Sequence, residues 1–228
     1  MPDVREKVIT LRVTSDALTV FAARMARKLP RLERLAMFGE WAPGLFHLGA
    51  ADIFLYLTTF TSVTYLQLST AHSLTAITFG RLICALPGLS HLSCRDLAFS
   101  ARSGLISGSF LMRRKPVTDL ELIRSDDVAE FFATSKMAVS LTRISFVGRV
   151  SQSLRQMLLA SESLQSLILT IPDLGPDVIL QDNTNLEALT VNRQYLSEWT
   201  NLLFPAAQSL RLSHVHLVCR DPLTLAIS

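Results

Sequence analysis

The stretch LPGLSHLSC at residues 86–94 recurs along the chain in altered form. Its apolar residues Leu89, Leu92 and Cys94 follow a fixed spacing, with two residues between the first and second and one between the second and third. Eight other stretches share this spacing, among them LPRLERLAM, VSLTRISF and TNLEALTV. One such unit is too small to bury its apolar side alone, so the pattern predicts stacked repeats with a continuous core.

We refer to the three apolar places of each unit as its first, second and third core positions. The first are predicted at Val8, Leu32, Val63, Leu89, Val117, Leu141, Leu164, Leu186 and Ala207. The second are Leu11, Leu35, Leu66, Leu92, Leu120, Ile144, Leu167, Leu189 and Leu210. The third are Val13, Met37, Leu68, Cys94, Leu122, Phe146, Leu169, Val191 and Leu212. Successive first positions are 21 to 31 residues apart, close to the period of about 20 to 29 residues of leucine-rich repeats.

Strand and helix patterns alternate along the chain. The last two core positions alternate with polar residues, which is the period of a half-buried strand. Apolar stripes at helical spacing lie between the strands, and Pro30 and Pro87 follow two of them, where proline ends a helix. The stripes are Leu18, Phe21, Ala22 and Met25; Phe79, Leu82, Ile83 and Leu86; Val128, Phe131 and Phe132; Leu154, Met157 and Leu158; and Leu196, Trp199 and Leu203.

The predicted fold is therefore α/β, a leucine-rich-repeat solenoid of about nine repeats with a curved parallel sheet on its concave side and helices on its convex side. We expect a single domain over residues 1–228, in which the array covers 8–214 and residues 215–228 form an incomplete repeat or a C-terminal cap. Cys94 would point into the core and His91 towards the concave surface. Residues on opposite sides of one strand cannot easily share a metal ion.

Composition narrows the class of protein. Hydrophobic residues make up 49% of the chain and charged residues 18%, which is enough for a sizeable core. The cysteines Cys84, Cys94 and Cys219 form no CxxC pair, and the chain has neither a signal-peptide pattern nor a glycosylation sequon, so we expect an intracellular protein, cytoplasmic or nuclear. Residues 53–80 lack charges but are rich in threonine and serine, which favours buried strands and helices over a membrane span.

The repeats resemble leucine-rich-repeat proteins from Val8 to about Leu212. The unit LPxLxxLxxxxxxF, residues 86–99, is similar to the repeat arrays of fungal F-box proteins. The resemblance implies a protein-interaction scaffold that presents substrates to a ubiquitin ligase. An F-box is not expected ahead of Val8, so the adaptor would bind only where an F-box is supplied elsewhere. The places where the family often carries a stacked asparagine hold Asp16, Glu40, Ala71 and Ser125 here.

No motif predicts catalysis, a cofactor or a metal. The chain has no GxSxG, no Gly-rich phosphate loop and no HExxH, and GLISG at residues 104–108 has the wrong spacing for a nucleophile elbow. His214, His216 and Cys219 lack an evident fourth zinc ligand, and the two histidines are expected to flank the exit of the last strand. We therefore predict a protein that is not an enzyme and has no cofactor.

Basic clusters leave a nucleic-acid-binding module as the alternative. They comprise Arg24, Arg27, Lys28, Arg31 and Arg34, and Arg113, Arg114 and Lys115. A solvated helix face and an exposed loop would look the same, and aromatic residues do not interleave with these clusters as a stacking platform requires.

The predicted partner site lies on the concave face of the sheet, where side chains two, four and six residues after each first core position project. Tyrosine and arginine are frequent hot-spot residues in protein interfaces. The predicted partner-binding residues are Arg34, Tyr65, Gln67, His91, Arg95, Asp119, Glu121 and Arg143. The competing interpretation is that they only keep the sheet soluble.

The chain is also expected to be a fragment of a longer array. The seven residues MPDVREK are too few for a capping helix ahead of the first strand. At the other end DPLTLAIS, residues 221–228, resembles the start of another helix, with Leu223, Ala226 and Ile227 at helical spacing. Alternatively these residues fold back as a cap.

Overall fold

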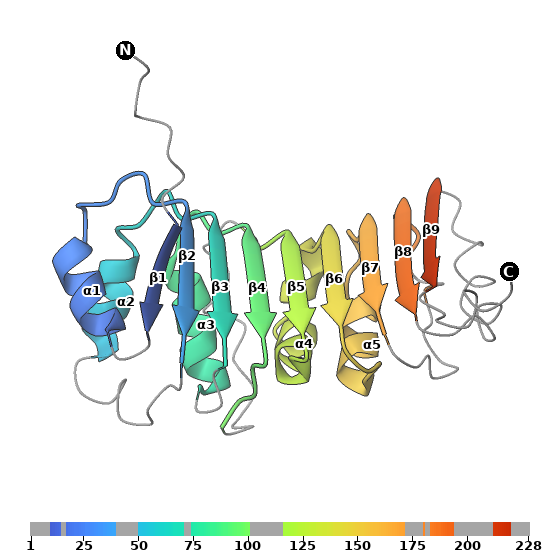
Figure 1. The fold of residues 1–228 in the computed structure, drawn as a ribbon, viewed down its shortest axis with the longest axis horizontal. Coiled ribbons are helices and arrows are strands. Elements are labelled where there is room, and N and C mark those ends of the chain that lie inside the picture. The colour runs from blue at the N-terminus through green and yellow to red at the C-terminus, as the bar shows by residue number, and fades with distance from the viewer. Residues whose placement is uncertain are drawn as a thin grey trace, which may run out of the picture. The chain divides into compact units, whose positions relative to one another are not determined.

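The computed structural model describes residues 10–14, 17–39, 50–70, 74–100, 116–171, 180, 183–193 and 212–219. Its contacts divide the chain into two compact units, Met1–Val117 and Thr118–Ser228, which we call unit 1 and unit 2. The fold is α/β, and within each unit the strands pair in parallel and in chain order (Figure 1). The α/β class with parallel strands is thus confirmed.

In its described residues, unit 1 alternates four strands with three helices. Its elements are β1 (Thr10–Thr14), α1 (Leu18–Met25), β2 (Arg34–Phe38), α2 (Ala50–Leu57), β3 (Tyr65–Ser69), α3 (Ala76–Ala85) and β4 (His91–Arg95). Helix α1 packs against α2, and α2 against α3. The segment 53–80, which has no charges, is therefore part of α2, β3 and α3. In the part of the chain that the structure describes, no helix combines the length and apolar character needed to cross a bilayer.

The described part of unit 2 contains five strands, β5 (Asp119–Ile123), β6 (Arg143–Val147), β7 (Ser166–Thr170), β8 (Ala188–Arg193) and β9 (His214–Cys219). Helix α4 (Asp126–Thr134) and a short 3-10 helix η3 (Met137–Ser140) precede β6, and helix α5 (Gln152–Leu159) precedes β7. Helices α4 and α5 pack against each other.

The strand register matches the predicted core positions. In unit 1 the second core positions Leu35, Leu66 and Leu92 are consecutive partners across the sheet, and each is buried. In unit 2 the same holds for Leu120 and Ile144. Alternate residues of a strand point to opposite faces. The apolar pattern therefore buries one face of each strand against the helices.

Two of the helices begin at a side-chain cap. The Thr75 hydroxyl accepts a hydrogen bond from the Thr78 N–H at 3.1 Å ahead of α3, and the Ser151 hydroxyl accepts one from the Leu154 N–H at 3.2 Å ahead of α5. Such caps satisfy backbone donors that the first helical turn leaves free. Both helices bury the predicted apolar stripe.

A tight turn leads into β2, β3, β4, β6, β7 and β8. The N–H of the first core position donates to the carbonyl three residues earlier, as from Val63 to Phe60 at 3.2 Å in unit 1 and from Leu141 to Ala138 at 3.0 Å in unit 2. Both residues that supply the carbonyl are buried. In all of these turns except that of Leu29, the turn therefore adds a fourth buried position to the repeat, which the pattern of three core positions missed.

One carbonyl at the entry of β2, β3, β5, β6, β7 and β8 accepts two backbone N–H groups from the next repeat. In unit 1 the Thr64 carbonyl accepts from Ser90 at 3.0 Å and His91 at 2.9 Å. In unit 2 the Thr118 carbonyl accepts from Thr142 at 2.8 Å and Arg143 at 3.0 Å. This double acceptor fixes the position of a strand along its neighbour. The strands therefore keep their register without an asparagine ladder.

The exits of β2, β3, β4, β5 and β6 are turned by a residue in the left-handed region, seven residues after the first core position. Its φ is 99° at Gly39, 54° at Thr70 and 52° at Asp96 in unit 1, and 49° at Arg124 and 156° at Gly148 in unit 2. Side chains other than glycine rarely adopt such angles. Their recurrence at one position shows that the turn, and not the local residue type, sets the backbone.

The ninth strand lies later than predicted. The pattern assigned its core positions to Ala207, Leu210 and Leu212, but in the structure Val215 and Leu217 pair with the second and third core positions of β8. Leu212 is therefore a first position and not a third. The spacing fits both frames because apolar residues occur at 207, 210, 212, 215 and 217, and the shorter interval was the wrong choice.

Further expectations have other outcomes. Residues 215–219, part of the segment predicted as an incomplete repeat or a C-terminal cap, belong to β9, and Ala50–Leu57 forms a helix that no predicted stripe covered. The stripe at 196–203 and the terminal segments 1–9 and 220–228 lie outside the described residues.

Candidate functional site

The outer face of unit 1 consists of the side chains two, four and six residues after each first core position. Since the core residues that alternate with them are buried, these side chains point away from the helices. Register places them in three rows across β1 to β4: Thr10, Arg34, Tyr65 and His91; Arg12, Ala36, Gln67 and Ser93; and Thr14, Phe38, Ser69 and Arg95. Five of the eight predicted site residues are therefore neighbours in this grid.

Two arginines of this face are held by aromatic rings. The Arg34 guanidinium carbon lies 4.3 Å from the centroid of the Tyr65 ring, on the adjacent strand. The Arg12 guanidinium carbon lies 5.5 Å from the centroid of the Phe38 ring. A guanidinium over a ring keeps its in-plane N–H groups available to an anion. Both arginines are exposed, as is Arg95 at the far edge of the grid.

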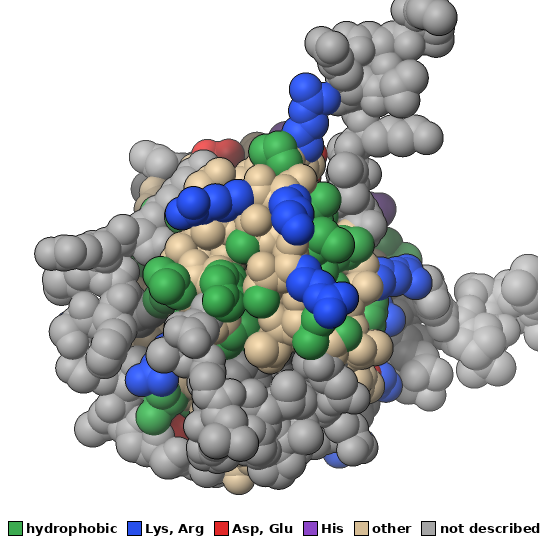
Figure 2. Space-filling model, turned by 90° about the vertical axis from the view of Figure 1, so that its left-hand side faces the viewer, with side chains coloured by type: hydrophobic (Ala, Val, Ile, Leu, Met, Phe, Trp, Pro, Cys, Tyr) green, Lys and Arg blue, Asp and Glu red, His purple; other side chains and the backbone are tan. Residues whose placement is uncertain are grey.

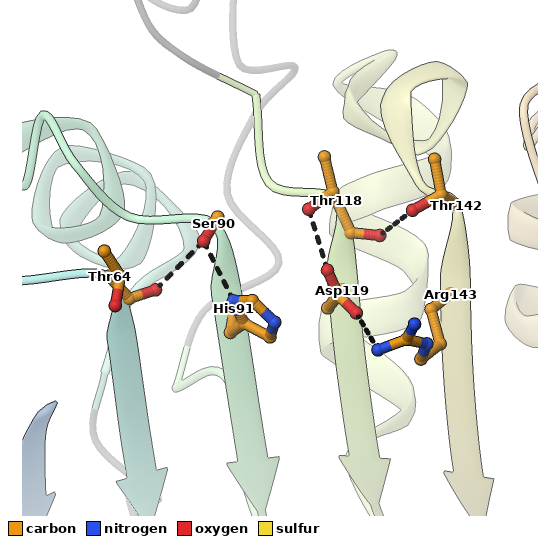
Figure 3. Close-up of polar contacts among 7 residues, drawn as sticks. All are labelled: Thr64, Ser90, His91, Thr118, Asp119, Thr142 and Arg143. Atoms are coloured by element: carbon orange, nitrogen blue, oxygen red, sulfur yellow. Dashed lines mark hydrogen bonds and ion pairs between the residues drawn. The ribbon is translucent and has the colours of Figure 1, made fainter.

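His91 is positioned by the residue before it. Its Nδ1 lies 2.8 Å from the Ser90 hydroxyl, which lies 3.4 Å from the Thr64 carbonyl (Figure 3). His91 is exposed, whereas Cys94 is fully buried on the opposite side of β4. The predicted placement of the two residues on opposite sides of the strand is thus confirmed.

The other three predicted site residues lie on unit 2. Arg143 on β6 forms an ion pair with Asp119 on β5 at 2.9 Å, and the Thr118 hydroxyl donates to the second oxygen of Asp119 at 2.8 Å (Figure 3). Glu121, two residues along β5, is half-buried. Arg143 is therefore already paired with a carboxylate, whereas Arg12, Arg34 and Arg95 of unit 1 have no such pair among the described residues.

The two histidines near the C-terminus are on a strand and not at its exit. His214 and His216 lie on β9, in line with Ala188 and Thr190 of β8, and both are exposed. The His214 Nδ1 lies 2.8 Å from the Ser213 hydroxyl. Among the described residues no three His, Cys, Asp or Glu side chains come together as a metal site.

Basic residues also cover the end of unit 1 that carries α1 and β1. Figure 2 views this end and shows Lys and Arg side chains spread among hydrophobic and polar ones. The predicted cluster contributes Arg24, Arg27, Lys28 and Arg31, all exposed in or after α1. The second predicted cluster, Arg113 to Lys115, lies outside the described residues.

Charge is unequally divided between the two units. Residues 1–117 hold 14 Lys and Arg against 7 Asp and Glu, a net charge of +7, and residues 118–228 hold 8 against 12, a net charge of −4. The modest +3 of the whole chain hides this difference. A charged partner would therefore discriminate between the units.

Comparisons with known proteins give no relative. The chain matches no protein-family model, no curated protein and no solved structure to a significant degree.

Arg12 and Phe38 were absent from the predicted site. Arg12 lies four residues after a first core position, but its ring partner Phe38 is on the next strand, two residues beyond the register partner of Arg12, so sequence spacing does not show the contact. The binding role of the eight predicted residues stays a prediction, since only their positions are now known.

Proposed function

We propose that the chain is a non-catalytic protein-binding scaffold of the leucine-rich-repeat solenoid class. The proposal draws on the repeated structural unit: a tight turn, a strand with one buried face, a left-handed exit and, between several strands, a helix. Stacked repeats of this kind present a row of outward side chains on a rigid backbone. No chemical step is included in the proposed function.

The observation that carries the proposal is the order of the outer face of unit 1. Arg34, Tyr65 and His91 stand next to one another in one row, each on its own strand. Arg34 is held by the Tyr65 ring and His91 by Ser90. Side chains that are ordered before binding lose less conformational entropy in a complex, which favours affinity.

The resemblance to F-box repeat arrays suggests the finer role of a substrate receptor. In that role the outer face would bind the protein to be ubiquitinated, and an F-box supplied outside this chain would bind the ligase adaptor. Affinity purification of the full-length protein from its native cell tests this role. Ligase subunits should co-purify with a dominant protein partner, and their absence would limit the function to a scaffold.

The scaffold itself is tested by substitutions on the outer faces. We expect Tyr65→Ala, His91→Ala and Arg143→Ala together to reduce partner binding at least tenfold while lowering the free energy of unfolding by no more than about 2 kcal/mol, since surface side chains contribute little to stability. The matched control replaces Ile77, Arg81 and Leu159 by alanine, because all three are exposed on helices. Full partner affinity in the first variant, with loss in the control, would move the site to the helices.

A nucleic-acid-binding function is the competing class. The exposed basic residues after α1 favour it, and partners recovered by purification separate the two. Recovery dominated by RNA or DNA that is released by moderate salt would support nucleic-acid binding, because phosphate contacts weaken steeply with ionic strength.

A further inference from the structure

We infer that the segment bound by the outer face of unit 1 is an acidic peptide segment of the partner, whose carboxylates pair with Arg12, Arg34 and Arg95. This inference rests on the proposed protein-binding function and adds the chemistry of the partner. It draws on three observations: the composition of the face, the way its arginines are held, and the contrast with unit 2.

The charged residues of the face are all basic. None of its twelve positions on β1 to β4 holds an aspartate or glutamate, and three hold an exposed arginine. Small side chains occupy positions between them, with Ala36 and Ser93 each 4% exposed. A ligand that lies across these strands therefore contacts long cationic side chains, between which the face carries small, buried side chains.

Two of these arginines are positioned, and no carboxylate of the described residues neutralises any of the three. Aromatic rings hold Arg12 and Arg34, and among the described residues no carboxylate lies within ion-pair distance of Arg12, Arg34 or Arg95. A guanidinium stacked on a ring can still donate two parallel N–H groups to a carboxylate, which is the strongest form of such pairing. In unit 2, by contrast, Arg143 already pairs with Asp119.

Peptide fits this face better than nucleic acid. Binding of single strands relies on aromatic rings with free faces for base stacking, whereas guanidinium groups lie over the rings of Tyr65 and Phe38. Three arginines also supply fewer phosphate contacts than the roughly six to ten that make nucleic-acid binding strongly salt-dependent. An extended acidic peptide needs only a few carboxylates at the spacing of neighbouring strands, about 4.8 Å.

The first test uses defined probes and the full chain. Fluorescence anisotropy should show that a short labelled peptide of alternating glutamate and serine binds at least tenfold more tightly than its glutamine counterpart. Combined Arg12→Ala, Arg34→Ala and Arg95→Ala should abolish this preference. Arg81→Ala on α3 removes the same charge from an exposed helix position and should leave it unchanged.

A second variant separates positioning from charge. Tyr65→Leu keeps the net charge and an apolar side chain but removes the ring under Arg34, so we expect it to weaken the glutamate peptide severalfold. Equal binding of the glutamate and glutamine peptides would overturn the inference. Tighter binding of an oligothymidine of equal length, dependent on the same arginines, would also overturn it.

The natural partner supplies the last test. A photo-crosslinking amino acid at Gln67, on the outer face, should label an acidic segment of the partner that mass spectrometry identifies, and the triple arginine variant should lose the label. Labelling of a neutral or basic segment that survives this variant would overturn the inference and leave the scaffold function intact. Labelling from Ile77 on α3 but not from Gln67 would overturn both.

Discussion

In unit 1 the Arg34 guanidinium carbon lies 4.3 Å from the Tyr65 ring centroid, whereas in unit 2 an Arg143 nitrogen lies 2.9 Å from an Asp119 oxygen. Both arginines sit two residues after a first core position, at the start of a strand. The repeat therefore determines the position of the arginine side chain, and the neighbouring strand determines which group the arginine contacts. A ring orders the guanidinium without cancelling its charge, and a carboxylate orders and cancels it.

The net charges of +7 and −4 extend this contrast to the whole of each unit. Shared hydrogen bonds at strand entries and exits show that the backbone plan is the same in both. Surface chemistry and backbone design thus vary independently in this protein.

The largest expected effect tests whether the two units share one core design. Leu66→Asp in unit 1 and Leu120→Asp in unit 2 each place a charge at a buried second core position. We expect each to lower the free energy of unfolding by more than about 4 kcal/mol, because the carboxylate has no partner there. Hydrogen exchange should show lost protection in the unit that carries the substitution. Gln67→Asp, at the adjacent outer position, is the control, and an unchanged melting curve for Leu66→Asp would reject the assigned repeat frame.

A medium effect on the free energy of unfolding is expected from substitutions in the turns that precede the strands, and it should differ between the two units. A Cβ on Gly88 of unit 1 would lie 2.4 Å from the Thr61 carbonyl oxygen, so Gly88→Ala should destabilise by about 2 kcal/mol or more. Ser163 of unit 2 occupies the same repeat position, and Ser163→Ala should stay within about 0.5 kcal/mol of the wild type. Urea denaturation measures both. Equal effects would mean that the close approach at Gly88 is not specific to that turn.

The smallest expected effect on the free energy of unfolding concerns the contacts of Arg34 and Arg143. Asp119→Asn should cost less than about 1 kcal/mol, because the partner Arg143 side chain is 62% exposed, and high salt should remove the cost. Tyr65→Leu should cost about 0.5 to 1 kcal/mol through the lost ring contact, with weaker salt dependence. Urea denaturation at low and high sodium chloride checks both, and a strong salt dependence for Tyr65→Leu would contradict the assignment.

The buried side of the fold was predictable from the sequence because burial follows a simple period. Leu35, Leu66 and Leu92 were assigned to one column by spacing alone, and they are consecutive partners in the sheet. The frame failed at β9, where Leu212 fits the first and the third core position equally well. Only pairing with β8 decides between those frames, and pairing is not visible in one strand's own spacing.

The candidate site was predictable in position but not in its contacts. Spacing placed Arg34, Tyr65 and His91 on one face. It did not show that the Tyr65 ring holds Arg34 or that Asp119 pairs with Arg143, since both contacts join residues of different strands. Which of these side chains contact each other depends on how far they extend across the sheet. A single sequence contains no direct signal for that.

The carbonyl that accepts two N–H groups at a strand entry belongs to the earlier repeat, and both donors belong to the later one. During synthesis the acceptor is therefore in place before its donors leave the ribosome. Each new strand can dock on a finished neighbour, with no need to wait for distant segments, as expected for domains that fold from the N-terminus. A nascent chain stalled after β3 should then already protect the backbone amides of β2 and β3.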